Sequence, residues 1–110
     1  MGRPMQYTNE SRGTVDVDGE IYLWEIRRQP RPVGKKEWEG MAIAFRHQEF
    51  KREAVAQYPM VYRPNGSPNL EKQRVDLDVL KVTVRSIIEA GWDPASRGKT
   101  VNFDVEADGT

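Results

Sequence analysis

Cysteine is absent from this sequence of 110 residues, and histidine occurs once, at His47. The chain therefore has no disulfide bond, no thiolate zinc site, no cysteine nucleophile and no pair of histidine ligands for a metal. No apolar run approaches the roughly 20 residues that span a bilayer, and residues 1–6 lack the apolar core of a signal peptide. Glycine-rich nucleotide-binding motifs are missing too. We therefore expect a cytoplasmic protein without a cofactor, a metal or a membrane partner.

The length predicts one domain, residues 1–110, and a hydrophobic fraction of 37% can form its core without disulfide staples. Residues 1–12 and 107–110 show no periodicity, and we expect both segments to be flexible. The 17 basic and 17 acidic residues cancel, but nine of the basic and only four of the acidic ones lie within residues 27–63. Basic residues are thus concentrated between two acidic flanks, while zero net charge gives no overall attraction to nucleic acid or anionic lipid.

A β-hairpin is the first element that the sequence predicts. Residues 14–17 alternate polar and apolar side chains, and residues 20–26 are rich in residues with high strand propensity. Asp18-Gly19 between them is typical of a tight hairpin turn, because glycine accepts the positive φ that such a turn needs. Residues 20–26 are apolar on both faces, which indicates a place inside the sheet rather than at its edge.

Two further strands follow a proline-rich loop at residues 29–34. Residues 41–46 alternate large apolar residues with alanine, so one face of this strand is small. Residues 49–58 fit either a strand or a helix, since their Glu, Lys, Arg and Ala residues favour helix. We expect a strand, because Pro59 disfavours helical geometry in the residue before it. The result is a three-stranded meander over residues 20–58.

A single amphipathic helix gives the clearest pattern in the sequence. Its apolar stripe, with spacings of three and four, consists of Leu77, Leu80, Val84, Ile87 and Ile88. Asp76 is suited to the N-cap, because its carboxylate can accept hydrogen bonds from the free amides of the first turn. Gly91 can take the left-handed position after the helix, and Pro94 prevents its continuation. We therefore expect a helix from about Asp76 to Ala90.

A last strand at residues 101–105 has one apolar face. The predicted order is β-β-β-β-α-β, an α+β fold in which a curled antiparallel sheet of four or five strands packs on one C-terminal helix. One helix cannot cover both faces of such a sheet. Either the sheet curls into a half-barrel around the helix, or its second face meets another protein.

The basic band, residues 27–52, is the main candidate binding feature. Arginine and lysine beside an aromatic side chain can hold phosphates and stack on bases. The same residues would also suit an acidic protein partner, or a solvated surface in which they pair with neighbouring glutamates. The candidate binding residues are Arg27, Arg28, Arg31, Lys35, Lys36, Trp38, Arg46 and Arg52.

Candidates for catalysis are few. His47 is the single imidazole base available, and no serine lies in a Gly-x-Ser-x-Gly turn. Glu37 and Glu39 would point the same way from a strand, at a separation compatible with acid–base catalysis, although alternating charge is also usual on a solvated strand. Asp16 and Asp18 resemble part of a calcium loop but fit a hairpin turn better. We therefore expect no catalytic and no metal-binding residues.

The C-terminal part carries a family resemblance. Residues 87–94, IIEAGWDP, and residues 99–103, KTVNF, resemble the end of small uncharacterised bacterial proteins in which a helix, a Gly-Trp-Asp-Pro turn and a last strand follow one another. Arg52-Glu53 and Tyr58-Pro59, around the fourth strand, are similar as well. The resemblance covers about half the chain and implies a soluble bacterial α+β protein. It carries over no activity, cofactor or catalytic residue.

Three functions are compatible with these features. The one we expect is a non-enzymatic binding or interaction module that self-associates, as a homodimer, through a sheet face or edge, because the sheet is apolar on both sides. The second is a nucleic-acid-binding accessory protein that uses the basic band. The third is a small enzyme that uses Glu37, Glu39 or His47.

Overall fold

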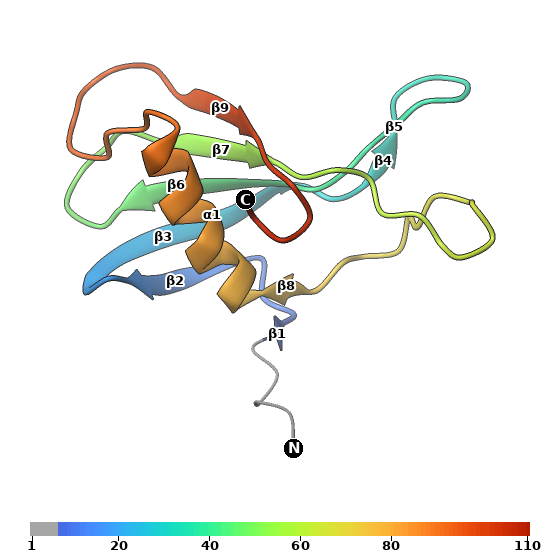
Figure 1. Cartoon of the computed structure of the whole chain (residues 1–110), viewed down its shortest axis with the longest axis horizontal. Helices are drawn as coiled ribbons and strands as arrows, with labels where there is room; N and C mark the ends of the chain where they lie inside the picture. Colours follow the sequence, from blue (N-terminus) through green and yellow to red (C-terminus); the bar gives the residue numbers. More distant parts are fainter. Residues whose placement is uncertain (1–6) are drawn as a thin grey trace.

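A computed structural model describes residues 7–110 and shows an open five-stranded sheet with one helix across one face (Figure 1). The helix is α1 (Leu77–Glu89). In their order across the sheet, the strands are β2 (Arg12–Val17), β3 (Glu20–Arg28), β6 (Ala42–His47), β7 (Ala54–Gln57) and β9 (Val101–Asp104). This is the α+β architecture that the sequence predicts.

The hairpin and the meander are confirmed. β2 and β3 pair antiparallel around a turn in which Asp18 and Gly19 have φ values of 56° and 86°, as a two-residue turn of this kind requires. β3, β6 and β7 continue as antiparallel neighbours. The segment at 49–58 contains a strand and not a helix, but the strand begins only at Ala54.

The pairing of the last strand differs from the expected antiparallel sheet. β9 lies parallel to β7, with Ala54 opposite Val101 and Gln57 opposite Asp104. The reason is the helix between them: a strand that is followed by a crossover helix returns to the sheet in its original direction. The sheet is therefore mixed, with four antiparallel strands and one parallel edge strand.

The helix begins and ends where its caps predict. Asp76 is the N-cap, and its side chain accepts a hydrogen bond of 2.9 Å from the backbone N–H of Asp78. At the other end Gly91 has a φ of 120°, and the N–H of Trp92 donates to the carbonyl of Ile87 at 2.9 Å. An N-cap of this kind contributes roughly 1 kcal/mol to stability.

The core lies between α1 and the inner face of the sheet, the face that α1 covers. The helix contributes Leu80, Val84 and Ile87, each at most 1% exposed, and burial of such a side chain contributes roughly 1.5–3 kcal/mol. Trp92, just after the helix, is 2% exposed, and its ring lies 5.9 Å from that of Tyr22 on β3. The sheet side of this core includes Trp24, Ile43, Phe45, Ala54 and Ala56.

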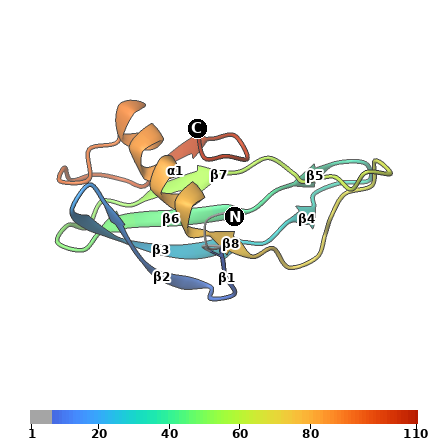
Figure 2. The same cartoon turned by 60° about the horizontal axis from the view of Figure 1, so that its bottom comes forward.

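Two arms project from the same end of the sheet (Figures 1 and 2). The first arm, residues 31–39, is a short ribbon in which β4 (Arg31–Pro32) pairs with β5 (Trp38–Glu39). The second arm, residues 61–69, is closed by a bridge between Tyr62 and Pro68. The sequence predicts a loop at residues 29–34 and places Glu37 and Glu39 on a strand, but it does not predict that the two segments pair, because strands of two residues give no periodic pattern.

Residues 7–8 and 106–110 form defined backbone contacts, while the expected flexibility of residues 1–12 and 107–110 stays a prediction. β1 (Tyr7–Thr8) pairs with β8 (Val75–Asp76) directly before α1, while residues 1–6 lie outside the described residues. At the other end Gly109 is buried, and its N–H donates to the carbonyl of Glu106 at 2.9 Å. A Cβ atom at Gly109 would lie 2.6 Å from the Thr83 hydroxyl on α1. Residues 107–110 therefore pack against the helix.

Candidate functional site

The outer face of the sheet, opposite α1, has a small centre and a charged rim. Ala42, Ala44 and Val55 form the centre and are at most 9% exposed. The surrounding side chains are longer, so the face encloses a shallow hollow of about 530 Å³. The residues of this face that line the hollow are Arg12, Thr14, Leu23, Glu25, Arg27, Ala44, Arg46 and Glu53.

A β-bulge turns two consecutive arginines toward this face. The register of β3 with β6 shifts between Ile26 and Arg28, and the extra residue places both Arg27 and Arg28 on the outer side. Arg27 Nε lies 2.9 Å from Glu25 on the same strand, and its Nη2 reaches past β6 to Glu53, just before β7, at 2.6 Å. Two carboxylates therefore neutralise this arginine, so an ion-pair network borders the small apolar centre of the outer face.

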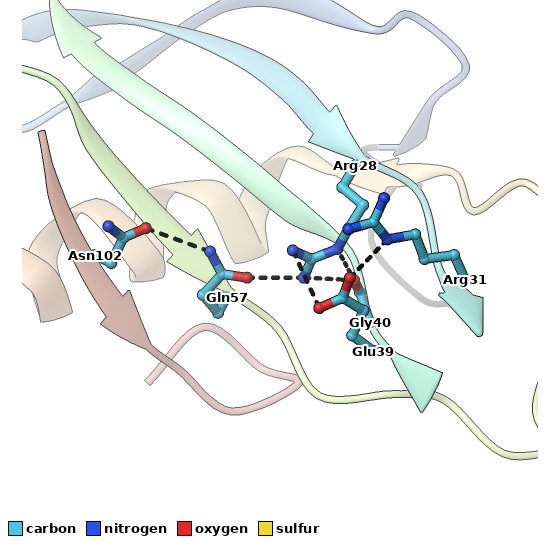
Figure 3. Close-up of polar contacts among 6 residues, drawn as sticks. All are labelled: Arg28, Arg31, Glu39, Gly40, Gln57 and Asn102. Carbon is cyan, nitrogen blue, oxygen red and sulfur yellow. Dashed lines mark hydrogen bonds and ion pairs between the residues drawn. The ribbon is translucent and has the colours of Figure 1, made fainter. Parts of the chain in front are cut away.

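Arg28 fixes the base of the first arm to the sheet (Figure 3). Its Nε and Nη2 donate to the carbonyl of Gly40 at 3.0 and 2.9 Å, and Nη2 also donates to Gln57 on β7 at 2.7 Å. Gln57 continues the network to Asn102 on β9 at 3.4 Å. Glu39 lies 3.6 Å from Arg28 Nη1 and adds an opposite charge. This half-buried part of the predicted basic band is therefore structural.

The other residues of the predicted basic band lie in separate places. Arg31 forms an ion pair of 2.6 Å with Glu39 at the base of the first arm (Figure 3). Lys35 and Lys36 are exposed at the tip of that arm, and Trp38 in β5 is half-buried. Arg46 lies on the outer face at the hollow. The structure thus does not gather the predicted binding residues into one surface.

Arg52 holds the loop between α1 and β9. Its Nη1 donates to the Ser96 hydroxyl at 2.8 Å and to the carbonyl of Arg97 at 3.4 Å. Gly98 has a φ of 148°, and a Cβ atom there would lie 3.3 Å from the guanidinium carbon of Arg52. The guanidinium is thus enclosed by the loop, which gives Arg52 a structural role.

His47 has both ring nitrogens engaged. Nε2 lies 2.7 Å from the Glu20 carboxylate, and Nδ1 accepts the backbone N–H of Glu49 at 3.1 Å. Nε2 therefore carries the proton and donates to Glu20. The side chain is 6% exposed, with the Tyr22 ring at 5.2 Å and the Phe50 ring at 4.8 Å. His47 thus anchors the end of β6.

Exposed apolar side chains gather on the two arms. Val33 on the first arm is 48% exposed, and Val61 and Tyr62 on the second are 43% and 54% exposed. Leu70, which follows the second arm, is 45% exposed. This end of the molecule therefore presents apolar surface that the core does not use.

A second, more apolar hollow of about 220 Å³ lies between the start of α1 and the second arm. Tyr58 lines it, and its hydroxyl is 2.7 Å from the Thr83 hydroxyl, which itself donates to the carbonyl of Val79 at 2.8 Å. Tyr58 is therefore the donor to Thr83. Burial raises the pKa of Tyr58 well above its ordinary value, against the weaker opposing effect of the Thr83 hydrogen bond.

β2 is an open edge of the sheet. It pairs with β3 on one side and with no strand of the described residues on the other. The Ile26 N–H donates to Ser11, and Ser11 stands opposite Ile26 when the β2–β3 register is extended by one residue. Because hydrogen-bonded pairs alternate along an antiparallel ladder, the backbone groups of Arg12, Thr14 and Asp16 point outward. The alternating pattern of residues 14–17 predicts the strand but not its place at the edge of the sheet.

Comparison with protein-family models, with curated proteins and with solved structures finds no match. The resemblance of the C-terminal part to small bacterial proteins therefore stays a prediction. Within residues 7–110, no group of three or more metal-ligating side chains is close enough to hold a metal ion. The helix of this part of the chain is also too short and too polar to cross a membrane.

Proposed function

We propose that the protein is a non-enzymatic interaction module that associates with a second copy of itself. The observation that carries this proposal is the open edge of β2, where the backbone donors and acceptors of three residues have no partner within residues 7–110. Such an edge pairs readily with another strand. The opposite edge strand, β9, is only four residues long and offers less backbone to a partner.

The positions of the catalytic candidates support a function without catalysis. His47 lies at one end of β6, and Gly40, beside Glu39, lies just before the other end. A strand of six residues separates them by roughly 20 Å. Glu39 is held by Arg28 and Arg31, so it is a partner of structural cations and is not positioned with His47.

The apolar ends of the arms support protein binding in general. Val33, Val61 and Tyr62 are exposed on two arms that leave the sheet at the same end, and the Arg28 network holds the first arm in place. Exposed apolar side chains on a fixed support are typical of protein–protein contacts. The arms thus offer a surface that is separate from the β2 edge.

Sedimentation velocity tests the proposal over protein concentrations from about 10 µM to about 1 mM, because a small edge interface gives a weak dimer. We expect the average sedimentation coefficient to rise from the monomer value toward that of a dimer. A coefficient that stays at the monomer value across this range contradicts the proposal.

Nucleic-acid binding is a second candidate function, and the tip of the first arm supports it. Lys35 and Lys36 are exposed there, and neither forms an ion pair within residues 7–110. A basic ribbon of this kind can follow a phosphate backbone. The outer face offers less support, because Trp24 and Phe45 of its strands lie in the core and leave no aromatic platform for bases.

Fluorescence anisotropy with labelled duplex DNA and single-stranded RNA, at about 50 mM salt, tests this second candidate. We expect Lys35→Glu combined with Lys36→Glu to abolish binding, and Arg46→Glu on the sheet face to leave it nearly unchanged. Absence of binding by the wild-type protein removes nucleic acid as a ligand.

A further inference from the structure

Charged side chains follow the open edge of β2 in an order that is complementary to itself. Arg12, Thr14 and Asp16 alternate with inward residues, and all three are exposed on the outer face of the sheet. A cation and an anion thus stand at equal distances from Thr14. When two copies of such a strand pair antiparallel about Thr14, each Arg12 stands opposite the Asp16 of the second copy.

The backbone allows this register. The outward N–H and C=O groups of β2 belong to the same three residues, Arg12, Thr14 and Asp16, because the intervening residues bond to β3. In an antiparallel pair centred on Thr14, these residues form the hydrogen-bonded pairs of the new ladder. A shift of two residues to either side would separate Arg12 from Asp16 of the second copy, so the charges select the central register.

The two charged side chains are available for such contacts. Arg12 forms no ion pair within residues 7–110, since Glu25, which stands opposite it on β3, is engaged by Arg27. Asp16 accepts one hydrogen bond of 2.9 Å from the Gly19 N–H, through Oδ1. Its second carboxylate oxygen can therefore accept from an arginine. Charges on an edge strand normally prevent pairing, but here opposite charges face each other.

We infer that the protein forms a symmetric dimer in which two β2 strands pair antiparallel about Thr14 and join two sheets into one of ten strands. This inference rests on the proposed self-association and names its surface. The two-fold axis is perpendicular to the sheet, so both copies of α1 lie on the same side and do not separate the strands. Thr14 pairs with Thr14 of the second copy, and Arg12–Asp16 contacts flank this centre on both sides.

Charge exchange between the two positions gives a test that is specific to this register. In an Arg12→Asp dimer, the introduced aspartate of each copy would face Asp16 of the other, and in an Asp16→Arg dimer two arginines would face each other in the same way. We therefore expect each variant to sediment as a monomer at about 500 µM, where we expect the wild type to dimerise. In an equimolar mixture the two variants are complementary, and we expect a heterodimer. With one variant labelled by a fluorophore, fluorescence-monitored sedimentation detects this heterodimer as an increase in the sedimentation coefficient of the labelled chain.

Thr14→Pro provides a second test that does not alter the Asp16 turn. Proline removes an outward N–H donor but leaves the hydrogen bonds to β3 intact, and we expect a folded monomer. Thr14→Val keeps the donor and should dimerise like the wild type. Arg46→Asp, on the outer face and away from the edge, should also dimerise. Circular dichroism establishes that each variant is folded.

The outcomes separate this inference from the proposed function. If the wild type dimerises but folded Thr14→Pro dimerises equally well, the interface is not the β2 edge, and only the inference is overturned. If the variant mixture stays monomeric although both variants are folded, the register is wrong. If the wild type is monomeric throughout, self-association itself is contradicted.

Discussion

Substitution of Gly40 by alanine should strongly destabilise the fold, because two backbone segments meet at this glycine. A Cβ atom at this position would lie against the carbonyl oxygen of Tyr58 and 2.5 Å from the carbonyl oxygen of Pro59. Backbone atoms cannot rotate away as a side chain can, so the chain between β5 and β6 must move. The carbonyl of Gly40 also accepts both hydrogen bonds from Arg28, and this movement would lengthen them.

The magnitude follows from these two effects. Overpacking of a close contact costs about 1–3 kcal/mol, and weakening of a hydrogen bond to a charged group adds about 1–2 kcal/mol. We therefore expect Gly40→Ala to lower the free energy of unfolding by about 2–5 kcal/mol. For a domain of this length, that corresponds to a decrease in Tm of roughly 10–25 °C.

Thermal unfolding followed by circular dichroism measures this decrease, and Gly34→Ala is the matched control. Gly34 lies in the first arm, where the nearest atom to an added Cβ is the Glu37 Cβ at 3.9 Å. We expect its Tm to change by no more than about 2 °C. Equal Tm values for Gly40→Ala and Gly34→Ala would refute the close packing of the first arm's base against Tyr58 and Pro59.

Two further predictions concern pH. Burial raises the pKa of Tyr58 above its ordinary value of 10.0, so its contribution to stability is complete below about pH 10 and is lost as the pH rises further. Tyr58→Phe should cost about 1 kcal/mol at neutral pH through the lost bond to Thr83, and urea titrations should show a smaller alkaline loss of stability than in the wild type. Arg85, through a hydrogen bond, lowers the pKa of Asp18 below its ordinary value of 3.8. This contribution to stability is present above that value and is lost as the pH falls. Asparagine tolerates the positive φ of the turn, so Asp18→Asn should stay folded and should lose less stability than the wild type between about pH 5 and 2. Equal losses in acid titrations of the two proteins would contradict this.

The elements that the sequence predicts correctly are those that neighbouring residues determine. Asp18 and Gly19 define their turn by their own backbone preferences, and the helix from Asp76 to Gly91 has its caps and its apolar stripe within sixteen residues. Pro59, which is also a local signal, favours a strand over a helix for residues 49–58, and the structure contains a strand there that begins only at Ala54. These elements could therefore be predicted before any tertiary contact was known.

The candidate site was less predictable, because side-chain direction depends on partners far along the chain. Arg27 and Arg28 are adjacent in sequence, and only the bulge opposite β6 places both on one face. Arg52 belongs to the same basic band, but it is occupied by Ser96, 44 positions away. Composition left open a cationic binding surface or a solvated one paired with glutamates, whereas the fold uses several of these cations to hold its own loops and strands.

The role of the charges on β2 cannot be predicted until the strands that pair with β2 are known. Arg12 and Asp16 would be an ordinary solvated pair if another strand covered β2. They become complementary to a second copy because the bonds to β3 turn the backbone of Thr14 outward. A shift of one residue in the β2–β3 register would have two effects. The backbone groups of Gly13 and Val15, which now bond to β3, would point to the open edge, and the side chains of Arg12 and Asp16 would point to the core face. The buried Val15 and Val17 prevent that shift, so the same apolar residues that form the core also fix the polarity of the open edge.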